Sequence, residues 1–174
     1  MQLFDTHAHY NDEKFDQDRD DVINAIYASG VTKLVNVGYS LESSIKAIEI
    51  ASKYNWMYAI CGISPNDIPE NYEEIDEQIT SLERVILNEN KTPKIVAIGE
   101  IGLDYYWDEN PERDIQKKVF REQMKLAEEL NLPVVIHDRD AHGDTLEIMK
   151  EFPNVRGTVH CFSGSLEFAK ECVK

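Results

Sequence analysis

The sequence predicts an α/β fold of the β/α-barrel type with about six βα units present, and three observations lead to it. Short apolar runs rich in Val and Ile recur along the chain, as in parallel strands that are buried on both faces. Segments with helical spacing of apolar residues lie between the runs. Neither a GxGxxG nor a Walker A pattern follows any run. Repeated βα units give an open doubly wound sheet or a closed barrel, and the third observation favours the barrel.

Six apolar runs are predicted to be strands. In chain order they are residues 3–6, 33–37, 57–62, 95–99, 133–136 and 155–159. Between them, apolar residues recur every three or four positions in segments that we expect to be helical. These segments are residues 15–26, 75–86, 120–130, 144–151 and 166–174. Gly30 and Pro133 follow the first and third of them, where a helix is expected to stop.

The length sets a limit on this barrel. A complete eightfold barrel needs about 250 residues, and the chain has 174. Six units alone would leave unpaired backbone groups along the first and sixth strands. The expectation is therefore that the chain is a fragment truncated at its C-terminus, that a second chain completes the barrel, or that the fold is not a full barrel. The only linker-like stretch, residues 88–94, is too short to separate domains, so residues 1–174 are expected to form one domain.

Composition narrows the class of protein. The formal net charge of −15 disfavours nucleic-acid binding through a basic patch, although bound metal ions could supply positive charge locally. The start of the chain shows no signal peptide, and no apolar run is long enough to span a bilayer. The three cysteines lack the spacing of a disulfide framework or a zinc module, and Cys61 and Cys161 are expected to pack as small apolar residues. A cytoplasmic protein is the expectation.

Histidines and one glutamate follow the predicted strands. His7 and His9 end the first strand two residues apart, so both imidazoles face the same way. Glu100, His137 and His160 come directly after the fourth, fifth and sixth runs. A structural histidine would explain any one of these positions, and an HxH pair is common by chance. Because all five positions would open onto the carboxyl end of one barrel, the joint pattern predicts a divalent-metal site instead.

Other residues near these positions have less specific signals. Arg139 is suited to bidentate contact with a phosphate or carboxylate. Ser163 lies in a small-residue turn that could present backbone N–H groups to an anion. Asp104 is a candidate outer partner of the metal site or a base. His142 is interpreted as a residue at the start of a helix, and the acidic run 67–77 as a solvated helix face.

At these residues the sequence closely resembles the TatD family of metal-dependent deoxyribonucleases, within the amidohydrolase-like TIM barrels. The resemblance covers the whole chain in the right order. Its matching elements are Asp5-Thr6-His7-Ala8-His9, Gly99-Glu100-Ile101-Gly102-Leu103-Asp104-Tyr105, Phe120 to Gln123, Pro133 to Ala141 and His160-Cys161-Phe162-Ser163-Gly164. Two features of the family are missing. The usual Gly-x-His-Pro motif reads Gly62-Ile63-Ser64-Pro65, and the family's aspartate after strand eight lies beyond Lys174.

The resemblance implies a hydrolase that cleaves DNA phosphodiester bonds, as a 3′-to-5′ exonuclease. It implies two divalent ions per site, Mg, Mn or Zn, held by His7, His9, Glu100, His137 and His160, with Glu100 also catalytic. Arg139 and Ser163 would contact the phosphate of the DNA substrate. Two alternatives stay open. The same site could hydrolyse a small amide, lactone or phosphoester, or the chain could be an inert fragment or an interaction subunit.

Overall fold

The computed structural model describes residues 2–69, 71–89 and 94–174, so the middle of the expected linker stretch, residues 90–93, lies outside the described residues. Its six strands alternate with helices throughout. The strands are β1 (Leu3–Ala8), β2 (Val31–Val37), β3 (Met57–Cys61), β4 (Ile95–Asp104), β5 (Val134–Arg139) and β6 (Gly157–Val159). The α-helices are α1 (Arg19–Ala28), α2 (Leu41–Ser52), α3 (Tyr72–Glu89), α4 (Arg113–Leu130), α5 (His142–Glu151) and α6 (Leu166–Cys172). Two short 3-10 helices, η1 (Glu13–Phe15) and η2 (Pro65–Asp67), follow β1 and β3.

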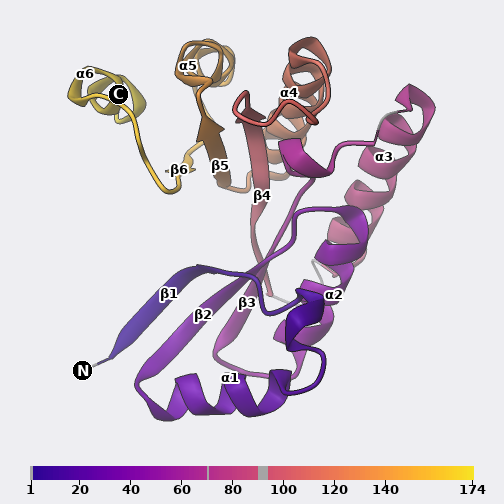
Figure 1. Ribbon diagram of the computed structural model, residues 1–174, viewed down its shortest axis with the longest axis vertical. Coiled ribbons are helices and arrows are strands. Elements are labelled where there is room, and N and C mark those ends of the chain that lie inside the picture. The colour runs from indigo at the N-terminus through magenta and orange to yellow at the C-terminus, as the bar shows by residue number, and fades with distance from the viewer. Residues whose placement is uncertain (1, 70, 90–93) are drawn as a thin grey trace.

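The strands form one parallel sheet in the order of the chain, β1 to β6. The sheet is strongly curved, and the helices follow one another around its outside (Figure 1). Every connection is a βα crossover, so all the strand carboxyl ends lie at the same end of the sheet. The chain is therefore six units of a β/α barrel, arranged as a half-barrel, which confirms the predicted fold class.

Apolar residues cover both faces of the sheet, which explains why the strand runs are continuous rather than alternating. The larger core lies between the sheet and the helices and includes the fully buried Leu34, Ile98 and Phe120. A smaller cluster centred on Ile60 and Ala97 lies on the inner, concave face. On this face a cavity of about 590 Å³ extends from Val35 and Ile60 to the amino ends of β5 and β6.

Several element boundaries differ from the prediction. Strand β4 continues five residues past Gly99, to Asp104, because Gly102 takes a φ of +135° and keeps the backbone paired with β5. Consequently Glu100, like His7 and His137, lies in the last part of its strand rather than after it. The helix expected over residues 15–26 begins only at Arg19. Helix α2, capped by the Ser40 hydroxyl, had no predicted range.

The cysteine expectation was half right. Cys61 is fully buried in the main core. Cys161 is exposed and has a φ of +44°, because the chain turns immediately after the short strand β6. Among the described residues, no helix combines the length and the apolar character needed to cross a membrane.

Candidate metal centre

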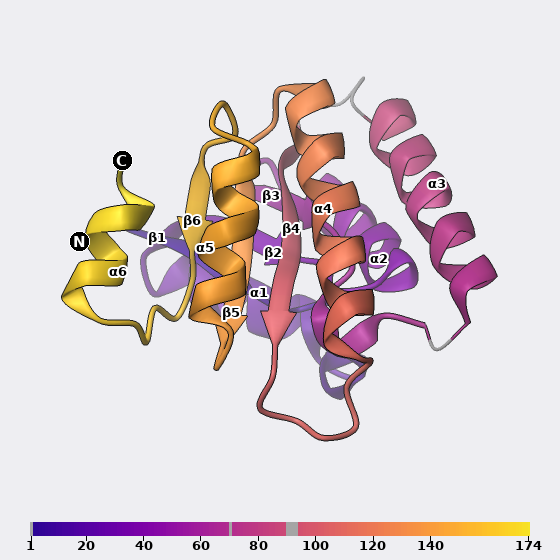
Figure 2. The same ribbon diagram turned by 90° about the horizontal axis from the view of Figure 1, so that it is seen from above.

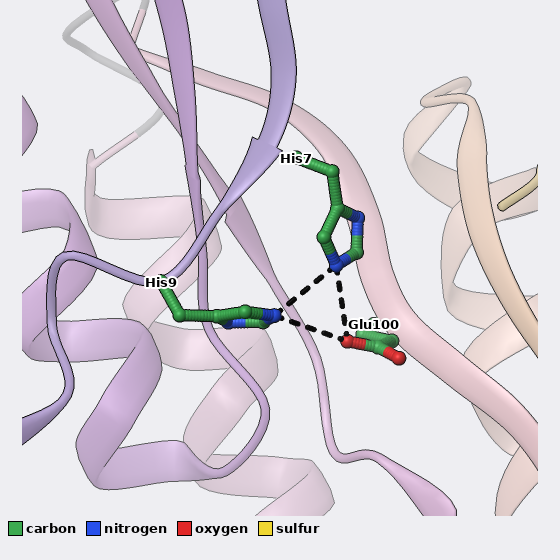
Figure 3. A group of neighbouring side chains, drawn as sticks. All are labelled: His7, His9 and Glu100. Carbon is green, nitrogen blue, oxygen red and sulfur yellow. Dashed lines mark hydrogen bonds and ion pairs between the residues drawn. The ribbon is translucent and has the colours of Figure 1, made fainter. Parts of the chain in front are cut away.

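The structure brings together the five residues that the sequence singled out as metal ligands. His7 lies near the end of β1, His9 directly follows that strand, and Glu100 comes from β4 (Figure 3). His137 comes from β5, and His160 follows β6 directly. The rings of His7 and His160 stack at a centroid distance of 4.2 Å, so the carboxyl ends of the first and last strands converge here. The carboxyl ends of four parallel strands, β1, β4, β5 and β6, thus bring these five side chains to one place.

The two carboxylate oxygens of Glu100 face different histidine pairs. Its Oε2 lies 3.4 Å from Nε2 of His7 and 3.7 Å from Nε2 of His9. Its Oε1 lies 2.9 Å from Nδ1 of His137 and 2.9 Å from Nε2 of His160. The five residues therefore divide into two groups of three, each with ligand atoms within 4.8 Å of one another, that share only Glu100.

The nitrogen distances within each pair fit a shared cation. Nε2 of His7 and Nε2 of His9 are 3.2 Å apart, and Nδ1 of His137 and Nε2 of His160 are 3.3 Å apart. Two imidazole nitrogens at about 2.0–2.1 Å from one tetrahedral ion stand about 3.3 Å apart. Two lone pairs at that distance repel unless a cation or a proton lies between them. Each group thus has the donor set and the spacing for one divalent ion.

Outer partners fix which nitrogen of two histidines is free to bind. Nδ1 of His9 lies 3.0 Å from the carbonyl oxygen of Val37, which can only accept, so the proton is on Nδ1 and the lone pair on Nε2. Nε2 of His137 lies 3.0 Å from Oδ2 of Asp104, and its Nδ1 lies 2.9 Å from Oε1 of Glu100, so both nitrogens donate to carboxylates and Nδ1 is the one that can release its proton to bind an ion. In both rings an outer acceptor holds one nitrogen and the other nitrogen faces the Glu100 carboxylate, which is the arrangement of a metal-ligating histidine.

Asp104 occupies the position of an outer partner of the metal site, which is one of the two roles that the sequence suggests for it, the other being a base. Its side chain is 1% exposed, and its Oδ1 accepts a hydrogen bond from the backbone N–H of Tyr106. Its backbone N–H donates to Gln116, which fixes the end of β4 against α4. Asp104 is therefore held rigidly behind His137, on the side away from Glu100.

The electrostatics of the centre keep Glu100 ionised. Burial would raise the pKa of this carboxyl, but hydrogen bonds from His137, His160 and His7 outweigh it and hold the pKa well below its usual range. Burial would lower the pKa of His137, but Glu100 and Asp104 raise it above 6.5. For His9 burial dominates, so its pKa lies below 6.5 and the ring is held neutral. A divalent cation requires an ionised carboxylate and neutral imidazoles, so Glu100 and His9 are ready to bind one and His137 must first release a proton.

Glycine at position 102 is needed to build this geometry. Its φ of +135° is a conformation that residues with a Cβ rarely adopt. A Cβ there would also stand 2.0 Å from the carbonyl oxygen of His137. The pairing register of β4 with β5 shifts between Ile98 and Ile101, around Glu100. The irregular segment, with Gly99 before Glu100 and Gly102 after it, is what turns Glu100 into the centre.

The remaining predicted site residues lie outside the ligand group. The guanidinium of Arg139 lies over the ring of Tyr106, 3.8 Å from its centroid. Ser163 is exposed in the loop between β6 and α6. His142 is the first residue of α5 and contacts Asp138 at 2.7 Å, in agreement with its interpretation as a residue at a helix start.

One acidic residue near the centre was missed. Asp67 was expected on a solvated helix face, but Pro65 starts the separate helix η2 and places Asp67 there. Its Oδ2 accepts a hydrogen bond of 2.5 Å from Ser64, the residue that replaces the histidine of the Gly-x-His-Pro motif. Loss of solvation raises the pKa of Asp67, and the charge of Glu100 raises it further. The sequence signals for this position were Pro65, just before the acidic run, and Pro69, which interrupts it.

Comparison with known proteins shows which family this chain resembles along its length. The model of the family described as TatD related DNase matches residues 4–174. YabD of Bacillus subtilis, named an uncharacterized metal-dependent hydrolase, is 45% identical over 99% of this chain and 65% of its own length. The TatD protein of Citrobacter koseri, named a 3′-5′ ssDNA/RNA exonuclease, is 32% identical over 98% of this chain and 64% of its own.

A solved structure shows the same fold. The crystal structure of YjjV, a TatD homologue from Escherichia coli K12, superposes with a TM-score of 0.86 at 31% identity, over 98% of this chain and 64% of that one. The chain thus spans about 65% of the length of the relatives it matches. With a family model over nearly every residue, this chain belongs to the TatD-related DNase family.

Proposed function

We propose that this chain carries the metal centre of a divalent-metal-dependent deoxyribonuclease that shortens DNA from the 3′ end. The observation that carries the proposal is the position of Glu100 between two histidine pairs, one on each carboxylate oxygen. Two ions bridged by a carboxylate suit phosphodiester hydrolysis, since they can stabilise both the attacking and the leaving oxygen. The activity stated in the name of the Citrobacter koseri relative supports the same choice of substrate.

The ions would be Mg, Mn or Zn, held by His7, His9, Glu100, His137 and His160. When bound, such ions lower the pKa of water and polarise the phosphoryl group. The chain's own residues do the rest. The charge of Glu100 partly neutralises the two cations, and Asp104 keeps His137 in the tautomer that binds through Nδ1.

Arg139 and Ser163 would contact the phosphate. The arginine supplies a planar pair of donors at the carboxyl end of β5, and the serine a hydroxyl in the loop after β6. This distribution reconciles a net charge of −15 with a DNA substrate, because the attraction is confined to the metal centre and Arg139. We further propose that residues 1–174 act as one hydrolase domain and that the protein is cytoplasmic, which the spacing of the cysteines supports.

The test is turnover of a single-stranded DNA oligonucleotide labelled at its 5′ end. The protein is freed of metal, and Mg²⁺, Mn²⁺ or Zn²⁺ is then restored. We expect a ladder of products shortened stepwise from the 3′ end, which disappears with chelator and in Glu100→Gln. Asp138→Asn is the matched control, because Asp138 is a buried carboxylate that contacts a histidine outside the centre.

Other outcomes identify the alternatives. Metal-dependent turnover of an amide or lactone without turnover of DNA would replace the nuclease with an amidohydrolase of the same site. The protein could also bind metal without turning over any of these substrates. If turnover then appears when the segment that matches the remaining third of the relatives' length is added, a second segment or chain completes the barrel. No metal binding at all would leave an inert fragment or an interaction subunit.

A further inference from the structure

Two large aromatic side chains are exposed beside the metal centre. Tyr106 and Trp107 follow β4, in the loop that extends beyond the strand's carboxyl end (Figure 2). They are 50% and 44% exposed, and their rings meet edge to face at a centroid distance of 4.7 Å and an angle of 88°. Arg139 lies over both rings, 3.8 Å from the first centroid and 5.3 Å from the second. Together these three side chains form an exposed aromatic surface with one positive charge.

This surface is fixed with respect to the candidate ions. The backbone N–H of Tyr106 donates to Asp104, whose other oxygen accepts from His137. The N–H of Tyr105 donates to the carbonyl oxygen of Arg139, which ties the end of β4 to the end of β5. Two hydrogen bonds therefore connect the backbone of Tyr106 to a candidate metal-ligating histidine, and they hold the loop that carries both rings next to the candidate centre.

The charge on Arg139 is available for a ligand. In the part of the chain that the structure describes, no ion pair joins Arg139 to a carboxylate, although acidic residues outnumber basic ones by 33 to 18. The guanidinium instead rests on aromatic faces, which orient it without neutralising it. An arginine held this way can donate two hydrogen bonds to a phosphate. An exposed aromatic pair with a free positive charge matches the composition of surfaces that bind single-stranded nucleic acids.

We propose that Tyr106 and Trp107 form a stacking platform for a nucleobase next to the scissile phosphate, with Arg139 on the adjoining phosphate. The inference rests on the proposed nuclease function and deepens it by naming the recognised group. Because the rings are perpendicular, one base stacks on one ring and meets the edge of the other. Every base has a π-face, so the platform does not select sequence. A base paired within a duplex is not free to stack there, so the platform selects single strands.

The test compares two tetranucleotides with the same phosphates, oligothymidine and its base-free analogue. Binding is measured by calorimetry with Ca²⁺ in place of the activating metal. We expect the Tyr106→Leu/Trp107→Leu double variant to bind oligothymidine about 5- to 150-fold more weakly, from the usual contribution of one stacked base. Binding of the base-free analogue is expected to change less than about twofold, because its phosphate contacts are intact. The Tyr106→Phe/Trp107→Phe variant keeps the aromatic faces and should retain the preference for bases.

The control is a partly exposed aromatic pair remote from the metal centre. Tyr27, 49% exposed, lies on Trp56 at 4.8 Å before β2 begins, at the opposite end of the sheet from the metal centre. Tyr27→Leu should leave both affinities unchanged. In a Trp56→Phe background Trp107 is the sole tryptophan, and its fluorescence should be quenched by oligothymidine but not by the base-free analogue. Absence of that quenching would refute the platform.

Hydrolysis separates this inference from the proposed function. If the wild type binds and cleaves both tetranucleotides equally, the platform is refuted and the nuclease stands. If it cleaves neither but binds oligothymidine more tightly, and the Leu double variant loses that difference, the nuclease is refuted and the platform stands. Equal loss of affinity for both ligands in the double variant would show a general structural defect and overturn the role of the rings.

Discussion

Asp104→Asn tests whether the metal centre depends on a fixed histidine tautomer. Asp104 Oδ2 accepts the Nε2 proton of His137 at 3.0 Å, and its Oδ1 accepts the N–H of Tyr106 at 3.0 Å. An asparagine has one acceptor where the aspartate has two, so an amide NH₂ must face one of these two donors. Facing His137, it requires the lone pair on Nε2 and keeps the imidazole proton on Nδ1, the nitrogen that the ion needs. Facing Tyr106, it leaves a buried N–H unpaired and displaces the loop.

The expected loss of metal affinity in Asp104→Asn follows from the contribution that an outer partner makes to its ligand. Loss of a hydrogen-bonded outer partner typically lowers metal affinity by about 10- to 100-fold. That corresponds to about 1.4–2.7 kcal/mol of binding free energy. Asp104 is 1% exposed, so solvent cannot replace the lost acceptor, and we expect the upper half of that range. Only the ion held with His137 and His160 should be affected, because the His7 and His9 pair makes its own contacts.

The assay is titration of metal-free protein with Mn²⁺, followed by calorimetry and by the electron paramagnetic resonance signal of free Mn²⁺. Two binding constants are expected for the wild type, of which one falls in Asp104→Asn. Asp138→Asn is again the control, because Asp138 is also a buried carboxylate next to a histidine, His142, but on the opposite face of β5. Its variant should lose thermal stability and keep both constants. If Asp104→Asn binds both ions within about twofold of the wild type, the outer-partner reasoning is wrong.

Three further predictions follow from the same geometry. His9→Gln and His160→Gln should each bind one ion where the wild type binds two, and retention of two by either variant would contradict the division into two groups. The pKa of His137 lies above 6.5, since two carboxylates outweigh its burial. A proton must therefore leave before Nδ1 binds metal, so Mn²⁺ affinity should rise with pH through 6.5, and equal affinity at about pH 6 and about pH 8 would contradict this. Gly102→Ala should cost about 3 kcal/mol or more in urea unfolding, from a strained φ and a backbone clash. Gly143→Ala, whose added Cβ meets nothing within 4 Å, should be neutral or slightly stabilising.

The sequence predicted the strand order and the convergence of the histidines with Glu100 because both depend on local patterns. Strands buried on both faces give apolar runs, and their carboxyl ends share one end of a barrel. Strand β4 was predicted five residues too short, because a buried glutamate between glycines resembles a loop until its partners are known. Helix α2 received no range, since buried serines such as Ser43 and Ser44 interrupt its apolar face.

Contacts between distant segments could not be read from the sequence. The approach of Asp67 to Glu100 depends on how η2 folds back toward the strand ends. The stacking of Arg139 on Tyr106 depends on the register of β4 against β5, where Asp104 pairs with Arg139. Such placements depend on tertiary packing, which periodicity does not encode.

The stacking of His7 on His160 has a consequence for the order of folding. Each βα unit consists of contacts between near neighbours in the chain, and such contacts form early because little chain entropy is lost in closing them. The metal centre instead joins the first strand to the last, so it is complete only when the whole sheet has curved into place. Ions that bind this final state alone would stabilise it by about 2.7 kcal/mol at a hundred times their dissociation constant. Metal uptake would therefore be the closing step of folding, and its loss would favour the first step of unfolding, separation of β1 from β6.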